Sequence, residues 1–297
     1  KKNQKRFALS HMIFACSQLP FPIDEQVKTG KKQVRRGTLK KLHRRYTESE
    51  PNKRLNAISK NTLEVIMENF SFYSPTYFVF GKGTEAETGK LVKKYGGHKV
   101  LIHYGGGSVK RSGLLDRVKA ALDAEGIAYV ELGGVKASPH ADLIYEGIEL
   151  AKKEGVDFVL PIGGGSVMDS AKGIALGVKY DGDFWDFYCG KKGPVTEALP
   201  VGCVVTIAAS GSEGSTDSVV TLVTEDGHQY KRCADGDILR PLFAIMNPEL
   251  MMTLPPYQTA SGLADIFAHC LERYFSHTKD CELTDRMLEA VMLTIIK

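Results

Sequence analysis

From Met67 onward, short apolar runs rich in β-branched residues alternate with segments whose apolar residues recur at helical spacing. The apolar runs predict strands over residues 76–80, 99–104, 128–132, 156–162, 200–207 and 242–246. The periodic segments predict helices over residues 85–95, 114–125 and 141–154, and a fourth helix that ends near Val178. Strands that alternate with helices are typical of an α/β fold with a mostly parallel sheet and helices on both faces.

The alternation stops in the last third of the chain. Residues 219–224 and 229–232 predict a strand pair that turns about Asp226-Gly227. Past Asn247-Pro248, the pattern predicts helices over residues 256–275 and 285–296. We therefore predict an α/β domain over residues 67–248 and the start of an all-helical domain over residues 249–297.

Residues 1–66 differ in composition from the rest of the chain. They hold 16 Lys and Arg but only 5 Asp and Glu, and they show no sustained apolar periodicity. This composition predicts a disordered basic extension, and it favours a solvated tail over a nucleic-acid-binding arm. The apolar patch at residues 12–23 is interrupted by Pro20 and Pro22, so we do not interpret it as a signal peptide. Because ordered patterning begins at Met67, the extension is a candidate for upstream sequence that the native protein lacks.

The overall composition is that of a globular protein. A chain of 297 residues with 43% hydrophobic residues can bury one large core or two, and no apolar run approaches the length of a membrane span. The six cysteines are scattered, without a C-x-x-C pair or the spacing of a zinc knuckle. We therefore expect a cytoplasmic protein with reduced thiols and no membrane partner.

The first candidate binding element is the glycine corner at residues 163–165, where a buried strand meets a helix. These glycines can adopt positive φ and let a ligand approach the backbone, while the helix N-terminus offers unpaired N–H groups. We expect a pyrophosphate there. Ser166 can cap the helix and donate to a phosphate, and Asp169 can accept from a ribose hydroxyl.

Interpretations of this corner that involve no ligand stay open. The spacing does not match the dinucleotide fingerprint G-x-G-x-x-G, so the glycines could form a plain turn. Asp169 could simply compensate the helix dipole, with Lys172 as its i+3 partner. Ser166 and Asp169 weigh against a plain turn, and residues 105–108 form a second glycine corner after a predicted strand. Residues 208–215 form a third small-residue corner that is rich in hydroxyls. Two glycine corners in one sheet favour an extended, two-ended ligand.

Asp265 and His269 form a candidate metal-binding pair. They are four residues apart on a predicted helix, so they share one helix face and could bind the same cation. The alternative is a plain surface pair, because two ligands do not complete a tetrahedral site. His277 lies eight residues further on with a different orientation, so we do not expect it to be a ligand.

Taken together, the motifs resemble the iron-containing (group III) alcohol dehydrogenases, in particular the butanol dehydrogenase-like aldehyde reductases. The resemblance runs from Met67 to Lys297. The motifs that carry it are Phe80-Gly-Lys-Gly83, Tyr104-Gly-Gly-Gly-Ser-Val-Lys110, Gly163-Gly-Gly-Ser-Val-Met-Asp-Ser-Ala-Lys172, Ser210-Gly-Ser-Glu213, Asn247-Pro248, Leu254-Pro-Pro256 and Gly262-Leu-Ala-Asp-Ile-Phe-Ala-His269. The resemblance implies that a dinucleotide-binding domain precedes a helical metal-binding domain, and that the cleft between them holds NAD(P)H and one divalent metal.

The family's functional residues map onto this sequence position by position. The resemblance implies a cofactor cradle formed by Gly105, Gly106, Gly107, Ser108, Gly163, Gly164, Gly165, Ser166 and Asp169. It implies that Thr206, Ser210 and Ser212 line the path to the nicotinamide and that Lys231 lies near the nicotinamide ribose, where a solvated hairpin lysine is the alternative. Asp265 and His269 match two metal ligands, which also makes them the candidate catalytic residues.

The resemblance also implies a reaction. A hydride would pass between NADP(H) and a primary alcohol or aldehyde such as butanol or butanal, with iron or zinc polarising the oxygen. The family takes two further metal-binding histidines from a later stretch, so we expect this chain by itself to be inactive, and we expect the full-length protein to be a homodimer. We expect NADP(H) to be favoured over NAD(H), because the corner at residues 105–111 carries Ser108, Lys110 and Arg111 and no acidic residue.

Two rival hypotheses stay open: another enzyme of the same superfold, and a fragment that is not an enzyme. A glycerol dehydrogenase or dehydroquinate synthase would share the glycine corner and the metal, but not the motifs at residues 210–213 and 254–256. A catalytically inactive nucleotide-binding or nucleic-acid-binding fragment would explain the basic extension and the incomplete metal site.

Overall fold

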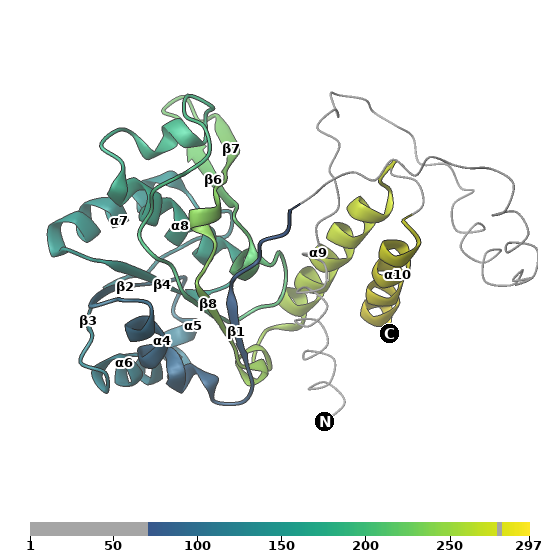
Figure 1. The fold of residues 1–297 in the computed structure, drawn as a ribbon, viewed down its shortest axis with the longest axis horizontal. Coiled ribbons are helices and arrows are strands. Elements are labelled where there is room, and N and C mark those ends of the chain that lie inside the picture. Colours follow the sequence, from purple (N-terminus) through teal and green to yellow (C-terminus); the bar gives the residue numbers. More distant parts are fainter. Residues whose placement is uncertain (1–70, 278–280) are drawn as a thin grey trace, which may run out of the picture. The chain divides into compact units, whose positions relative to one another are not determined.

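The computed structural model describes residues 71–277 and 281–297, so the predicted extension over residues 1–66 lies outside the described residues. Within the described ranges, six strands form one sheet in the order β1-β8-β5-β4-β2-β3 (Figure 1). These strands are β1 (Tyr77–Phe80), β2 (Lys99–Tyr104), β3 (Ala128–Leu132), β4 (Phe158–Gly163), β5 (Cys203–Val205) and β8 (Phe243–Met246). The helices connecting them include α4 (Thr88–Lys94), α5 (Ser108–Arg111), α6 (Leu114–Asp123), α7 (Ala141–Glu154) and α8 (Gly165–Lys179).

All neighbouring strands of this sheet run parallel to one another. Parallel strands need crossover connections, which are usually helices. The observed sheet therefore confirms the predicted α/β class. The predicted bounds of β2, β3 and α7 also match the observed ones.

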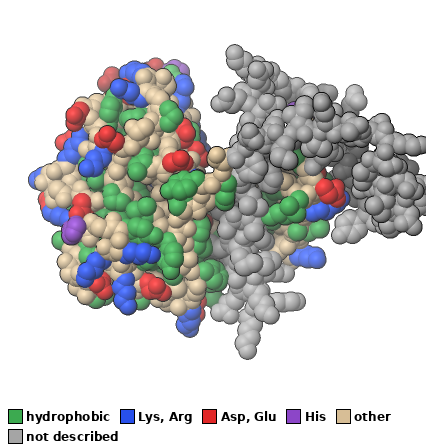
Figure 2. All heavy atoms as spheres, in the orientation of Figure 1, with side chains coloured by type: hydrophobic (Ala, Val, Ile, Leu, Met, Phe, Trp, Pro, Cys, Tyr) green, Lys and Arg blue, Asp and Glu red, His purple; other side chains and the backbone are tan. Residues whose placement is uncertain are grey.

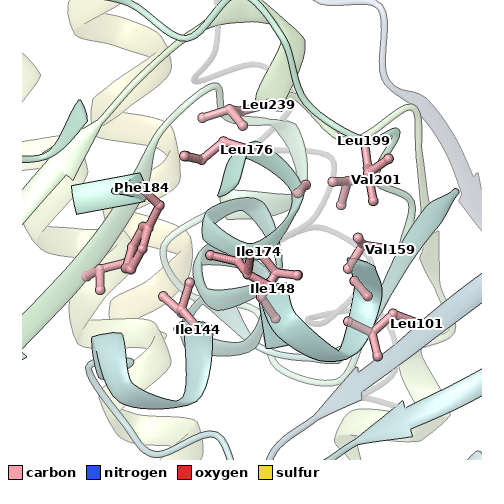
Figure 3. Packing of buried hydrophobic residues seen from close by; sticks show 14 of the residues in the cluster. Leu101, Ile144, Ile148, Val159, Ile174, Leu176, Phe184, Leu199, Val201 and Leu239 are labelled. Atoms are coloured by element: carbon pink, nitrogen blue, oxygen red, sulfur yellow. The ribbon is translucent and has the colours of Figure 1, made fainter. Parts of the chain in front are cut away.

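Side chains of successive strand residues point to opposite faces of the sheet, and each face is covered by its own helices. On one face, Leu101 of β2 and Val159 of β4 belong to a buried cluster with Ile144 and Ile148 of α7 and Ile174 of α8 (Figure 3). The other face packs under α4 and α6. Its cluster includes Leu91, Val92, Val100, Ile102, Leu114, Leu115, Val118, Leu122, Phe158, Leu160, Ile162, Phe243 and Ile245.

Two predicted elements differ from the observed ones. The helix predicted over residues 85–95 is split into a 3₁₀ turn, η1 (Thr84–Glu87), and α4. The Thr88 hydroxyl donates to the carbonyl oxygen of Glu85 at 2.6 Å, and this local bond supports the tighter turn at the junction. The strand predicted over residues 200–207 is regular only as β5, although Val201 still bridges to Val159.

The chain also forms a hairpin and two C-terminal helices. Strands β6 (Ser218–Val223) and β7 (Gln229–Ala234) pair antiparallel, as predicted, in a sheet of their own. Helices α9 (Pro256–Tyr274) and α10 (Glu282–Ile296) pack against each other through a small cluster. The cluster's buried members are Ile266, Cys270, Leu288, Val291 and Met292. The domain boundaries at residues 66–67 and 248–249 stay predictions.

Charge is mixed on the visible face of the α/β part. Figure 2 shows Lys and Arg side chains interspersed with Asp and Glu there. This face of the described residues therefore presents no concentrated basic surface of the kind that nucleic-acid binding needs. In the described ranges, every helix falls short of the length or apolar character that a bilayer span requires.

Candidate functional site

The strand order reverses between β2 and β4. β3 lies on one side of β2, whereas β4, β5 and β8 continue on its other side. In open α/β sheets, ligands bind beyond the carboxyl ends of the strands at such a reversal. Tyr104 pairs in register with Ile162, so the glycine corners that follow β2 and β4 leave the sheet side by side. The structure thus brings the two predicted corners to one edge of the sheet.

The glycines after β4 are required by close packing and not by positive φ, which corrects the sequence-based interpretation. Gly163, Gly164 and Gly165 all have ordinary backbone angles. A Cβ atom on any of them would clash with a neighbouring side chain. The clashing groups are Val167 for Gly163, Ile207 for Gly164 and Ser210 for Gly165. Glycine therefore lets the segment after β5 approach the start of α8 directly.

The N-terminus of α8 presents free backbone donors. Gly164 is the N-cap residue, and the amides of Val167 and Met168 both donate to its carbonyl oxygen. Within the described part of the chain, the amides of Gly165 and Ser166 have no hydrogen-bond acceptor. These donors and the helix dipole suit a phosphate group.

Ser166 does not cap α8, contrary to the sequence-based expectation. It lies inside the first turn, and its Oγ accepts a hydrogen bond of 3.3 Å from the amide of Ser138. Ser138 has a φ of 54°, a left-handed conformation that is uncommon for a residue other than glycine. Sequence reasoning missed Ser138, because a Ser-Pro dipeptide indicates a turn but not its contact with another corner.

The corner after β2 is open. Ser108 begins the short helix α5, and Gly107 is its N-cap residue. A Cβ atom on the exposed Gly106 would meet no atom within 4 Å, and one on Gly105 would make only ordinary contacts. The protein itself therefore leaves room beside this corner, as a bound ligand requires.

Asp169 and Ser212 are bonded to each other. The hydroxyl of Ser212 donates to Oδ1 of Asp169 at 2.6 Å, and Ser212 is buried. Burial raises the pKa of the Asp169 carboxyl, an effect that the charge of Lys172 and the bond from Ser212 oppose. A ribose contact by the partly exposed Asp169 and a lining role for Ser212 stay predictions.

Lys172, the i+3 neighbour of Asp169, is wholly buried. Its Nζ donates to the carbonyl oxygens of Ser212 at 2.8 Å, Ser215 at 2.9 Å and Asp217 at 2.8 Å, and to the Ser212 hydroxyl at 3.0 Å. Burial lowers the pKa of this ammonium group, while nearby carboxylates act in the opposite direction. Sequence reasoning missed this contact, because helical spacing shows nothing of a loop forty residues away.

Three other predicted residues fall in different surroundings. Thr206 continues the pairing of β5, because its amide donates to the carbonyl oxygen of Gly163 at 3.0 Å. Ser210 is partly exposed and lies against Gly165. Lys231 is exposed on β7 opposite Thr221, and its side chain makes no hydrogen bond or ion pair within the described residues.

The candidate metal pair lies on α9. Nε2 of His269 is 3.8 Å from Oδ1 of Asp265, and both side chains are about half exposed. Across the part of the chain that the structure describes, no group of three or more His, Cys, Asp and Glu could hold a metal ion. The described residues therefore fit two ligands of a metal and do not complete its coordination.

A close contact joins α9 to the segment after β5. A Cβ atom on Gly262 would clash with the carbonyl oxygen of Ala208, so this glycine lets the two backbones approach. Asp265 and His269 follow Gly262 at i+3 and i+7, which places all three on one helix face. The Asp–His pair is thus on the side of α9 that meets this segment.

Comparisons with known proteins bear on the family to which the chain belongs. The family model for iron-containing alcohol dehydrogenase matches residues 75–248. A probable NADH-dependent butanol dehydrogenase of Bacillus subtilis is 44% identical over 231 residues, which are 78% of this chain and 58% of the relative. An NADPH-dependent aldehyde reductase of Escherichia coli, YqhD, is 36% identical over 233 residues, with the same shares covered.

A solved structure is also similar. The NADH-dependent butanol dehydrogenase A of Thermotoga maritima has a TM-score of 0.74 and 41% identity, over 77% of this chain and 56% of that one. The chain thus spans somewhat over half the length of these relatives. Since the family model covers more than half of the sequence and the fold agrees, the chain belongs to the iron-containing alcohol dehydrogenase family.

Proposed function

We propose that this chain is the cofactor-binding portion of an NAD(P)H-dependent alcohol dehydrogenase or aldehyde reductase. The observation that carries the proposal is the pair of glycine corners at the strand-order reversal, with the free amides of Gly165 and Ser166 at the second corner. The substrate class we propose is a primary alcohol or aldehyde, such as butanol or butanal. The relatives are named as butanol dehydrogenase and aldehyde reductase, which supports this class.

Different groups of the proposed cofactor residues would bind different parts of the dinucleotide. The amides of Gly165 and Ser166 would bind the pyrophosphate at the N-terminus of α8. The open corner at residues 105–108 would receive the adenosine side, because it follows the neighbouring strand β2. Residues 206–212, which follow β5, would face the nicotinamide side. Bound there, the nicotinamide supplies the hydride.

We propose a preference for NADP(H) over NAD(H). Residues 105–111, at the corner after β2, include the exposed Lys110 and Arg111 and the Ser108 hydroxyl and no acidic residue, and the carboxylate of Glu131 on β3 is bonded to the Tyr104 hydroxyl at 3.0 Å. The Lys110 ammonium lies 5.2 Å from the ring centre of Tyr104, which keeps its charge at the end of β2. The relatives include both NADH-dependent and NADPH-dependent enzymes, so their names do not decide between the two cofactors. The cofactor preference of this chain has to be measured.

We propose that Asp265 and His269 are two ligands of one divalent metal, iron or zinc. Carboxylate and imidazole are ligands that both metals accept. Such a metal would act as a Lewis acid on the substrate oxygen. We also propose that the native enzyme acts in the cytoplasm as a homodimer.

The proposal is tested by cofactor binding to the 297-residue chain. Isothermal titration with ADP, NADH and NADPH should show saturable binding for all three. Gly165→Val should weaken each by about tenfold or more, because its side chain would crowd the amides of Gly165 and Ser166, which would bind the pyrophosphate common to all three. Gly193→Ala is the matched control, since a Cβ atom there would meet nothing within 4 Å. A wild-type chain that binds none of the three would contradict the proposal.

A further inference from the structure

Lys172 ties one loop to the helix that begins at the proposed phosphate site. Its four acceptors all belong to residues 212–217, and three of them are backbone carbonyl oxygens. Ser212 adds a second bond to the same helix through Asp169. Just beyond this loop, the Ser218 hydroxyl donates to the carbonyl oxygen of Asp169 at 2.7 Å. The loop is therefore held on α8 at several points.

Packing alone does not explain a lysine here. A side chain that is wholly buried loses its hydration, and an apolar residue of similar size would avoid that cost. The ammonium group adds directional hydrogen bonds, because its three protons fix the carbonyl groups of Ser212, Ser215 and Asp217 in one arrangement. The contact therefore sets the conformation of the loop.

The segment immediately before this loop touches both parts of the proposed active site. Ser210 lies against Gly165 at the start of α8, and the carbonyl oxygen of Ala208 lies against Gly262 on α9. Asp265 is one turn further along the same face of α9. Residues 206–212 therefore lie between the phosphate-binding helix and the candidate metal pair, and Lys172 fixes the end of this segment.

We infer that Lys172 is a positioning residue for the nicotinamide half of the cofactor. By holding residues 212–217 on α8, it sets the place of residues 206–212, against which the nicotinamide would bind. The adenosine half would bind at residues 105–108, which Lys172 does not touch. The inference rests on the proposed function, and it predicts that the two halves of the dinucleotide respond differently to loss of the ammonium group.

The test compares ADP with NADPH on the 297-residue chain. Lys172→Met keeps the length and apolar stem but removes the charge, and Lys179→Met is the matched control at the exposed end of the same helix. We expect Lys172→Met to bind ADP within about twofold of wild type and NADPH at least about tenfold more weakly. The fluorescence of bound NADPH, which reports the surroundings of the nicotinamide ring, should shift toward that of the free cofactor. Lys179→Met should change none of these.

Ser212→Ala gives a second, milder variant in case Lys172→Met does not fold, as judged by circular dichroism and thermal melting. It removes one acceptor of Lys172 and the donor to Asp169. We expect a roughly threefold loss of NADPH affinity with ADP unchanged. Equal losses of ADP and NADPH affinity, or unchanged NADPH affinity in a folded variant, would overturn the inference while leaving the proposed function in place. A wild-type chain that binds neither ligand would defeat both.

Discussion

His103 of β2 and Ser170 of α8 are joined by a hydrogen bond of 2.8 Å between Nε2 and Oγ. The other ring nitrogen, Nδ1, lies 2.8 Å from the carbonyl oxygen of Leu132 on β3. Because a carbonyl oxygen only accepts, Nδ1 carries the proton and Nε2 accepts from the Ser170 hydroxyl. The neutral ring therefore connects α8 to two strands of the sheet.

The first prediction is that this buried histidine makes the fold sensitive to acid. Burial lowers the pKa of His103 from 6.5 to about 4. At pH values between these two, the unfolded chain therefore binds a proton on this ring that the native state does not bind. The contribution of His103 is complete above about pH 6.5 and is lost as the pH falls toward about 4. The free energy of unfolding should drop by about 3 kcal/mol over this window from His103 alone.

Urea unfolding across this pH range measures the effect. His103→Leu removes the titrating group, so its stability should vary less steeply with pH than that of wild type. The exposed His228→Gln controls for the change in histidine content. Equal slopes for His103→Leu and wild type would contradict the prediction.

Local patterning predicted the sheet well, because its central strands β2, β4, β5 and β8 are buried on both faces and read as continuous apolar runs. Residues such as Leu101 and Ile174 recur with the period of the element they occupy, and the structure buries both. The two glycine corners meet at one edge of the sheet because β2 and β4 run parallel and therefore end at the same edge. These features depend on neighbours in sequence or on a general rule of topology, so one sequence suffices to find them.

The role of single residues in the site could not be predicted in the same way. The i+3 spacing indicates only that Lys172 neighbours Asp169, whereas the structure shows that the loop at residues 212–217 also binds its ammonium group. Gly164 is a glycine because Ile207 packs against it, and no local signal encodes that approach. Such contacts arise between segments far apart in sequence, so the local spacing of residues does not reveal them.

The second prediction concerns the packing of α7 against α8. A Cβ atom on Gly147 would clash with Cδ1 of Ile174, so the overpacking in Gly147→Ala should cost about 1–3 kcal/mol of stability. The higher helix propensity of alanine should offset about 1 kcal/mol of this cost. Ile174→Ala should cost about 2–5 kcal/mol by leaving a cavity. In the double variant the new methyl group enters that cavity, so the combined loss should be smaller than the sum. Additive losses in urea unfolding would show that the two positions do not share this space.

The third prediction is that Gly106→Asp shifts the cofactor preference toward NADH. The new carboxylate would stand in open space beside Ser108, where it would repel a 2′-phosphate and could accept from a 2′-hydroxyl. We expect the ratio of NADPH affinity to NADH affinity to fall by about tenfold or more, with ADP affinity little changed. Gly193→Asp adds the same charge at an exposed position outside the site and should leave the ratio unchanged. A ratio that stays constant in Gly106→Asp would place the 2′-position of the ribose elsewhere.

The last prediction concerns the pair on α9. Because Asp265 and His269 are 3.8 Å apart on one helix face, a divalent cation can bind both, and removing either leaves a single ligand. Titration of the 297-residue chain with Co²⁺, Zn²⁺ or Fe²⁺ should therefore show one weak site per chain. Asp265→Asn and His269→Gln should each weaken it by about tenfold, in line with the loss of one ligand. Glu225→Gln removes an exposed carboxylate outside α9 and should have no effect. If Glu225→Gln weakened binding as much as Asp265→Asn, the cation would be held by the general charge of the chain, and Asp265 and His269 would not be its ligands.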